Sequence, residues 1–407
     1  MKSLQIVDIV PMVMQAGAPS STAWTGAGGK SALATARNWL FVKVITNVDG
    51  LFGIGEGSGW PRVLHTAVQD LKAELIGQDP RHIERLWQRM RLATMGHGDT
   101  GVVGAGAITA IDMALWDIKG KLLGTPVWDL LGGQVRDKVR YYAHAKSVDQ
   151  ARALVATGVT TIKLGGHHDI VARCFALREA LGDRIDICVD LHGPPWLPAI
   201  DSIAIGKALE PCNLLFIEDP VSPEDLEGWG RVRRALDNTP IAGGERLANK
   251  WGAMALLGEL VDIIQPDTGR CGGITEMKKI AALAETHFVQ VAPHSGSLGP
   301  VAEFAAVHLM SAIPNGLMME RLEPDWSGKE AAVRTGLVAS AGHITVPTEP
   351  GLGVELNEAF VAQHPSQRNV AIATGGWQDP QEEGRTYVSM RRQRARLTSQ
   401  DQSIEPK

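Results

Sequence analysis

The chain has 407 residues, of which 44% are hydrophobic and 21% are charged, a composition typical of a globular protein with a sizeable core. Its 40 Lys and Arg residues against 45 Asp and Glu residues give a formal net charge of −5, which argues against a nucleic-acid-binding protein because such a protein needs a basic face. The chain has no uncharged apolar run of about 18 residues, no signal-peptide core and no Cys-x-x-Cys pair, so we expect no membrane span and a cytoplasmic protein with reduced, buried thiols.

The first 60 residues predict β-strands. Apolar runs at 6–13, 39–45 and 51–55 carry this signal, and the turn at Asp49-Gly50 between the last two predicts a hairpin. The Gly- and Ser-rich segment 16–29 is too long for a tight turn and is therefore either floppy or functional. Helices are predicted over 62–124, where apolar residues in 105–122 have helical spacing and Gly124-Thr125-Pro126 ends the pattern.

From residue 139 onward, apolar strand candidates alternate with helical stretches. This alternation predicts parallel strands joined by right-handed crossovers. Eight such units favour a (β/α)₈ barrel or a modified form of it. An open doubly wound sheet is the alternative, although no G-x-G-x-x-G motif follows the first strand. The strand candidates are 139–145, 160–165, 186–191, 214–218, 240–243, 262–266, 288–293 and 317–320.

Polar side chains stand at the ends of the second to eighth of these strands. In a barrel, the carboxyl ends of the strands carry the functional residues, so we expect these side chains to meet. In chain order they are Lys163, Asp190 with His192 two residues later, Glu218, Glu245, Asp267, His294 and Glu320.

Asp190, Glu218 and Glu245 follow three consecutive strands. One such acidic residue would more often be a helix cap or half of a surface ion pair. Three at equivalent positions predict a metal site, and hard oxygen ligands suit Mg²⁺, whereas Zn²⁺ would more often recruit His or Cys.

Asp267 and His294 end adjacent strands. A lone histidine is usually structural, but an Asp beside a His fixes the tautomer of the ring and raises its basicity. Opposite a predicted metal site, this pair is a candidate general base.

Together the polar residues at these strand ends resemble those of the enolase superfamily, and within it those of the mandelate racemase subgroup. Segments 124–133 and 350–354 also match, so the resemblance spans roughly residues 1–360. It implies an α/β fold, a modified (β/α)₇β TIM-like barrel with an α+β capping domain. The implied domains are 1–136 for the cap, 137–325 for the barrel, and 326–407 for a C-terminal segment that returns to the cap and carries a polar tail.

The segment Asp190-Leu191-His192-Gly193 is similar to the Asp-x-His-Gly segment of sugar-acid dehydratases of the galactonate and gluconate type. This resemblance implies that Mg²⁺ on Asp190, Glu218 and Glu245 holds an aldonate and that His294 removes its C2 proton. His192 then protonates the departing 3-hydroxyl, because hydroxide is a poor leaving group. The product would be a 2-keto-3-deoxy acid. The alternative is a structural role for His192, packed beside the metal ligands.

Three further residues are implied to contact the substrate. Glu320, in its protonated form, would bind the substrate carboxylate, Lys163 would act as a base or an anion-binding group, and Trp24 lies in a specificity loop. The competing function is a racemase or epimerase that uses Lys163 and His294 on opposite faces, and a non-catalytic scaffold is a third. The expected partner is a small sugar acid, with no nucleic acid and no membrane, and the resemblance implies a homo-oligomer.

Overall fold

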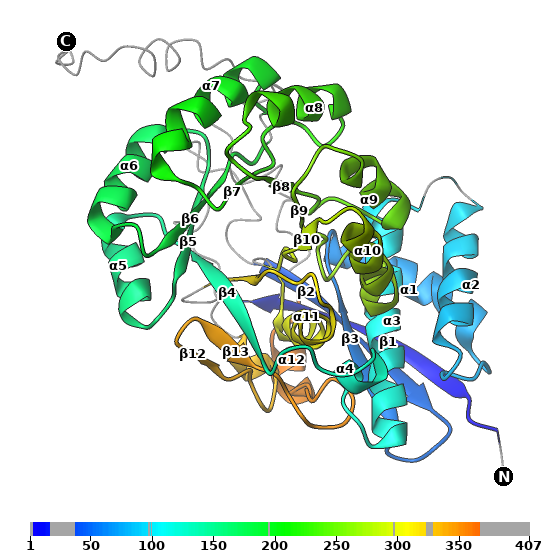
Figure 1. Ribbon diagram of the computed structural model, residues 1–407. Coiled ribbons are helices and arrows are strands. Elements are labelled where there is room, and N and C mark those ends of the chain that lie inside the picture. The colour runs from blue at the N-terminus through cyan, green and yellow to red at the C-terminus, as the bar shows by residue number, and fades with distance from the viewer. Residues whose placement is uncertain are drawn as a thin grey trace.

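The computed structural model describes residues 3–16, 37–96, 98, 100–193, 196–295, 298–322 and 329–366. The predicted loop with Trp24 and the polar tail lie outside these described residues. Figure 1 shows an N-terminal part, in blue and cyan, beside a ring of strands and helices in green and yellow.

The N-terminal part is a three-stranded antiparallel sheet covered by helices. The strands pair in the order β1 (Ile6–Ala16), β2 (Arg37–Thr46) and β3 (Phe52–Gly57). The helices are α1 (Pro61–Leu75), α2 (Ile83–Met95), α3 (Gly101–Leu123) and the short α4 (Val127–Leu130). α3 lies so close to β3 that a Cβ at Gly53 or Gly55 would stand 1.9 or 1.8 Å from a carbonyl oxygen of the helix. Glycine at these strand positions therefore permits the contact.

The residues from β4 to β11, after α4, form the barrel. The sheet order is β10-β9-β8-β7-β6-β5-β4, and β11 pairs with β4, so the eighth strand lies beside the first. A parallel bridge between Val291 of β10 and Gly316, just before β11, closes the ring and excludes an open doubly wound sheet. Because seven helices lie between eight parallel strands in the described part of the chain, the predicted (β/α)₇β architecture is confirmed. The strands are β4 (Lys138–His144), β5 (Thr161–Gly165), β6 (Asp186–Asp190), β7 (Phe216–Glu218), β8 (Ile241–Gly243), β9 (Ile263–Ile264), β10 (Gln290–Val291) and β11 (Met319–Arg321). The helices are α5 (Val148–Ala156), α6 (Ile170–Leu181), α7 (Ala199–Leu209), α8 (Leu226–Ala235), α9 (Lys250–Leu257), α10 (Gly273–Thr286) and α11 (Pro300–Ala312).

The chain then returns to the N-terminal sheet. β13 (His343–Thr345) pairs with β12 (Ala339–Ser340) and with β4, and α12 (Glu358–Gln363) lies against β1. Gln15 N donates to His364 O at 2.8 Å, and Lys43 pairs with Glu358 at 2.6 Å. The exact domain limits at residues 136 and 325 stay a prediction.

Two buried carboxylates of the cap bind the first turns of barrel helices. Glu56 accepts hydrogen bonds from the N–H groups of Gly299, at 2.5 Å, and Ala302, at 3.0 Å, at the start of α11. Asp112 accepts from Thr275 N and Oγ1, at 3.0 and 2.5 Å, at the start of α10. Burial raises the pKa of each carboxyl to about 7. Each cap residue therefore supplies the acceptor that the free N–H groups of a helix start require.

α3 is long and apolar enough to cross a membrane, since an 18-residue window has a mean hydropathy of 1.4, but 72% of that window is buried inside the protein. Its contacts with β3 and α10 explain this apolar character. The four cysteines are all buried free thiols, as expected from the sequence.

His308 joins three segments and makes stability depend on pH. Its Nδ1 accepts from Trp128 N at 3.2 Å, and its Nε2–H donates to Leu352 O at 3.0 Å, so the fully buried ring is neutral. Burial lowers the pKa of His308 from 6.5 to about 4. This group stabilises the fold fully above pH 6.5, and about 3 kcal/mol should be lost as the pH falls from 6.5 to 4, because only the unfolded chain gains the proton.

We expect His308→Gln to be less stable than the wild type at pH 7 but to lose less stability between pH 6.5 and 4. Urea unfolding of both proteins across this range measures the difference. Equal pH slopes for the two proteins would contradict the assignment.

Candidate active site

The strand ends bring the predicted polar residues to one edge of the barrel. Asp190 ends β6 and Glu218 ends β7, and the parallel register places these two residues side by side. Glu245 follows β8 by two residues, Lys163 lies in β5, and Glu320 lies in β11. This arrangement follows from the strand alternation, because carboxyl ends of parallel strands share one edge.

Lys163 lies among three carboxylates. Its Nζ is 3.2 Å from Asp190 Oδ2, 2.8 Å from Glu218 Oε2 and 2.9 Å from Glu320 Oε1. The side chain is 1% exposed. Burial alone would lower the pKa of Lys163, but the carboxylates raise it well above its usual range. Lys163 is therefore an ammonium that donates hydrogen bonds to Glu218 and Glu320 and forms an ion pair with Asp190.

Glu218 is the most deeply buried of the candidate metal ligands, with no exposed surface. Gln265 Nε2 donates to its Oε2 at 2.8 Å. Burial, followed by the neighbouring charge of Asp190, raises the pKa of Glu218 well above its usual range. Gln265 stands two residues before Asp267 and therefore on the same face of its strand, a spacing that could have identified it.

Glu245 lies between two imidazoles. Its Oε2 is 3.2 Å from His294 Nε2, and its Oε1 is 3.7 Å from His192 Nδ1. Burial would raise the pKa of Glu245, but His294 and His192 lower it overall. The two predicted catalytic histidines thus approach different oxygens of one carboxylate.

His294 and Asp267 form the predicted pair. His294 Nδ1 is 2.5 Å from Asp267 Oδ2, and the backbones of the two residues form a parallel bridge. Because a carboxylate can only accept, Nδ1 carries a proton and Nε2 is the atom that can take up another. Burial alone would lower the pKa of His294, but carboxylates, Glu320 and Glu245 first, raise it to about 9.

His192 is fixed by Arg246, which the sequence analysis did not single out. Arg246 Nη2 lies 3.3 Å from His192 Nε2, and Nη1 lies 2.8 Å from Glu245 Oε1 and also pairs with Asp219. Burial lowers the pKa of His192. The position of Arg246, directly after a candidate metal ligand, was the available sequence signal.

Glu320 is surrounded by donor groups. His144 Nε2 lies 2.5 Å from its Oε1, and Ser295 N donates to its Oε2 at 3.0 Å. Burial alone would raise the pKa of Glu320. Neighbouring positive groups, the ammonium of Lys163 first, instead hold that pKa well below its usual range. The protonated form of Glu320 in the substrate complex, which the resemblance implies, stays a prediction. His144, in the first barrel strand, was missed because only the ends of the later strands had been considered.

The chemistry of the donor set suits a divalent cation. Among the described residues, six acidic side chains gather here with Lys163, Arg246 and Arg270 as permanent cations, so negative charge is in excess. Asp190, Glu218 and Glu245 offer hard oxygen atoms of the kind that Mg²⁺ prefers. A second grouping, with ligand atoms within 4.8 Å of one another, comprises His192, Asp219 and Glu245. Glu245 belongs to both sets.

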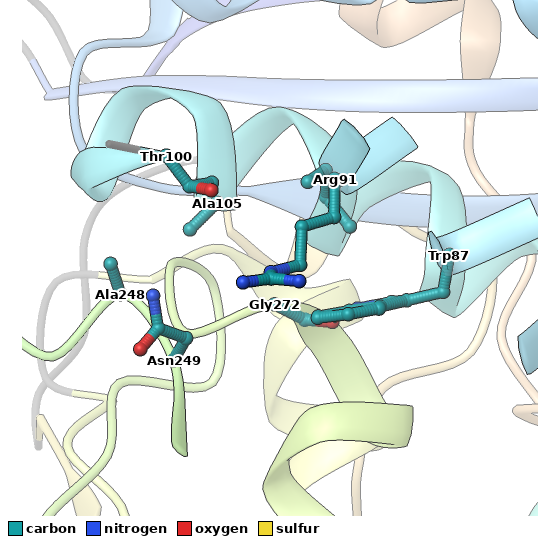
Figure 2. Close-up of a pocket in the computed structure, with 8 residues that line it drawn as sticks. Trp87, Arg91, Thr100, Ala105, Ala248, Asn249 and Gly272 are labelled. Carbon is teal, nitrogen blue, oxygen red and sulfur yellow. The ribbon is translucent and has the colours of Figure 1, made fainter. Parts of the chain in front are cut away.

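A separate pocket lies between cap helices α2 and α3 and the loop after β8 (Figure 2). Figure 2 shows the guanidinium of Arg91 beside the ring of Trp87 and above Gly272. None of the predicted catalytic residues lines this pocket, so the carboxylate cluster is the candidate active site. The lining residues are Trp87, Arg91, Thr100, Ala105, Ile108, Ala248, Asn249 and Gly272.

Comparisons with known proteins agree with this fold and place the chain in a family. Residues 146–360 match the family described as enolase C-terminal domain-like, and residues 21–132 match the N-terminal domain of mandelate racemase / muconate lactonizing enzyme. A D-galactonate dehydratase of Ralstonia pickettii is 38% identical over 80% of this chain and 90% of its own length. One of Pectobacterium atrosepticum is 37% identical over the same shares.

Solved structures give the same result. An enolase from Pantoea ananatis with bound D-gluconate and Mg has a TM-score of 0.80 at 29% identity, covering 90% of this chain and 96% of its own. The 3,6-anhydro-D-galactonate cycloisomerase from Zobellia galactanivorans has a TM-score of 0.78 at 31% identity, covering 89% of this chain and 100% of its own. The chain therefore belongs to the mandelate racemase / muconate lactonizing enzyme family of the enolase superfamily.

Proposed function

We propose that the protein is a Mg²⁺-dependent dehydratase that converts an aldonate to a 2-keto-3-deoxy acid. The observation that carries this proposal is the pair of imidazoles, His294 and His192, at opposite oxygens of Glu245. Elimination of water needs a base at C2 and an acid at the 3-hydroxyl, and this site offers one histidine for each. The D-galactonate dehydratase relatives and the neighbour that binds D-gluconate and Mg support the substrate class.

Asp190, Glu218 and Glu245 would hold the metal, which when bound stabilises the negative charge that develops on the substrate carboxylate. His294 Nε2 takes the C2 proton, while Asp267 keeps the other ring nitrogen protonated and the ring in place. His192 gives a proton to the 3-hydroxyl, which leaves as water. The resulting enol tautomerises to the 2-keto acid.

The racemase alternative needs Lys163 as a second base. In this structure its ammonium donates to Glu218 and Glu320 and lies 3.2 Å from Asp190 Oδ2. The observation that favours dehydration is the second imidazole, His192, near Glu245, because elimination needs an acid for the leaving hydroxyl and racemisation does not.

The first experiment incubates the purified protein and Mg²⁺ with a panel of aldonic and aldaric acids in D₂O, starting with D-galactonate and D-gluconate. We expect 2-keto acid from one substrate or from a few that are stereochemically related. Deuterium in recovered substrate or its epimer, without any keto acid, would overturn the proposal in favour of a racemase or epimerase.

We predict that His192→Asn lowers keto-acid formation by about 100-fold or more but retains deuterium exchange at C2. The base and its partner Asp267 are intact in this variant, so only the second half of the reaction is lost. The measurement is NMR of the substrate in D₂O beside an assay of keto acid. His287→Asn, at an exposed position, is the control, and equal loss of both signals in His192→Asn would contradict the acid role.

A further inference from the structure

Asp267 has a second cationic partner that the mechanism above does not use. Arg270 Nη2 lies 3.0 Å from Asp267 Oδ2, the same oxygen that binds His294 Nδ1. Gly269 N donates to the other oxygen, Oδ1, at 2.8 Å. Asp267 has no exposed surface, and the Arg270 side chain is 16% exposed. Three donors thus fix both oxygens of the carboxylate.

The turn that carries Arg270 is itself held in place. Arg270 N and Cys271 N both donate to Asp267 O at 3.2 Å, and Thr268 N donates to His294 O at 3.3 Å. The guanidinium therefore approaches Asp267 from a backbone that is already bonded to the two residues of the pair. A buried carboxylate that lost this partner would lose a main restraint on its orientation.

Arg270 also connects the pair to the cap. Its Nη2 lies 3.4 Å from Ser58 Oγ, and its Nη1 lies 3.5 Å from Glu245 O. Ser58 N donates to Gly269 O at 2.6 Å, and a Cβ at Gly269 would stand 2.6 Å from Ser58 Cβ. The segment after β3 is thus pressed against the turn that carries Arg270.

We infer that Arg270, supported by Ser58 of the cap, is the positioning residue of the His294–Asp267 pair. It holds the Asp267 carboxylate in the plane that keeps the His294 ring directed at the substrate. The rate of proton transfer falls steeply when the base is slightly misplaced, so loss of this restraint lowers the rate of C2 deprotonation. This inference rests on the proposed base role of His294.

The test compares Arg270→Gln and Arg270→Lys with the wild type in the C2 exchange assay, using Mg²⁺ and the aldonate that gives the highest rate. Arg270→Gln is expected to lower the exchange rate by about 10- to 100-fold, with KM changed less than about twofold. Arg270→Lys keeps the charge and should lose less. Arg334→Gln, at an exposed ion pair, is the matched control.

A double-mutant cycle separates positioning from general damage. In an Asp267→Asn background, Arg270→Gln should change the remaining exchange rate by less than about threefold, because its effect passes through Asp267. An additive loss, or an unchanged exchange rate in folded Arg270→Gln, would overturn the inference. Ser58→Ala should act in the same direction with a smaller effect.

The second readout is the low-field proton resonance of His294 Nδ1–H. It should be displaced or broadened in Arg270→Gln and Arg270→Lys, and an unchanged resonance in both would overturn the inference. If Arg270→Gln does not fold, Arg270→Lys and Ser58→Ala carry both measurements. Failure of the proposed function is distinguishable, because C2 exchange would then survive in His294→Asn.

Discussion

His294→Asn is expected to lower both C2 deuterium exchange and keto-acid formation by about 10³-fold. The amide has no basic nitrogen, whereas His294 Nε2 is the atom of the pair that can accept a proton while Asp267 binds Nδ1 at 2.5 Å. Joint loss of the two signals distinguishes the base from His192, whose variant should lose only the second.

The measurement is single-turnover formation of keto acid together with NMR of C2 in D₂O. Unchanged binding of Mg²⁺, measured by titration calorimetry, is the control for an intact site. Exchange at the wild-type rate would exclude His294 as the base.

The rate of C2 exchange should also rise with pH until the His294 ring is neutral, because its carboxylate neighbours raise the pKa of His294 to about 9. Mg²⁺ bound at Glu245 would offset the negative charge of that carboxylate. In the metal-loaded protein the rise in rate should therefore occur at lower pH.

Glu218→Gln is expected to abolish the stabilisation of the protein by Mg²⁺. Binding of Mg²⁺ at 100 times its Kd should stabilise the wild type by about 2.7 kcal/mol and the variant hardly at all. In the metal-free protein the variant should unfold at the same temperature as the wild type or higher. Burial raises the pKa of the Glu218 carboxyl. The carboxyl therefore contributes to folding stability below the pKa that it has in the unfolded chain, and this contribution is lost as the pH rises. At pH 7 the buried anion is unfavourable for folding.

Thermal unfolding in EDTA and in excess Mg²⁺ measures both effects. Glu224→Gln, at an exposed position in the loop after β7, is the matched control. An equal rise in the midpoint with Mg²⁺ in Glu218→Gln and the wild type would show that Glu218 is not a ligand.

The barrel could be predicted from the sequence because its strands are apolar runs of nearly constant spacing, and each of the first seven is followed by a helix. The positions of Asp190 and Glu218 follow from this alone, since parallel register brings successive strand ends together. The lengths of β9 and β10 could not be predicted. Each is only two residues long, although 262–266 and 288–293 were expected, because Asp267 and His294 continue the pairing only as an isolated bridge.

Contacts between segments far apart in the chain were beyond the sequence pattern. The strand-end rule placed Lys163 at the site but gave no sign that its ammonium contacts three carboxylates. Arg246 and Arg270 lie in turns, where an arginine has no preferred partner in a periodic pattern. Asp112 and Thr275 are 163 residues apart, and their hydrogen bond depends on how the cap lies on the barrel.

The two cap carboxylates at the starts of α10 and α11 also constrain the order in which the chain can mature during synthesis. The N-terminal sheet leaves the ribosome first, but Glu56 and Asp112 have no helix to bind until residues near 275 and 300 have followed. The bond from Gln15 N to His364 O forms later still. A nascent cap therefore exposes buried acids and an unpaired strand edge through most of translation, and we expect the growing chain to need chaperone protection until the barrel closes.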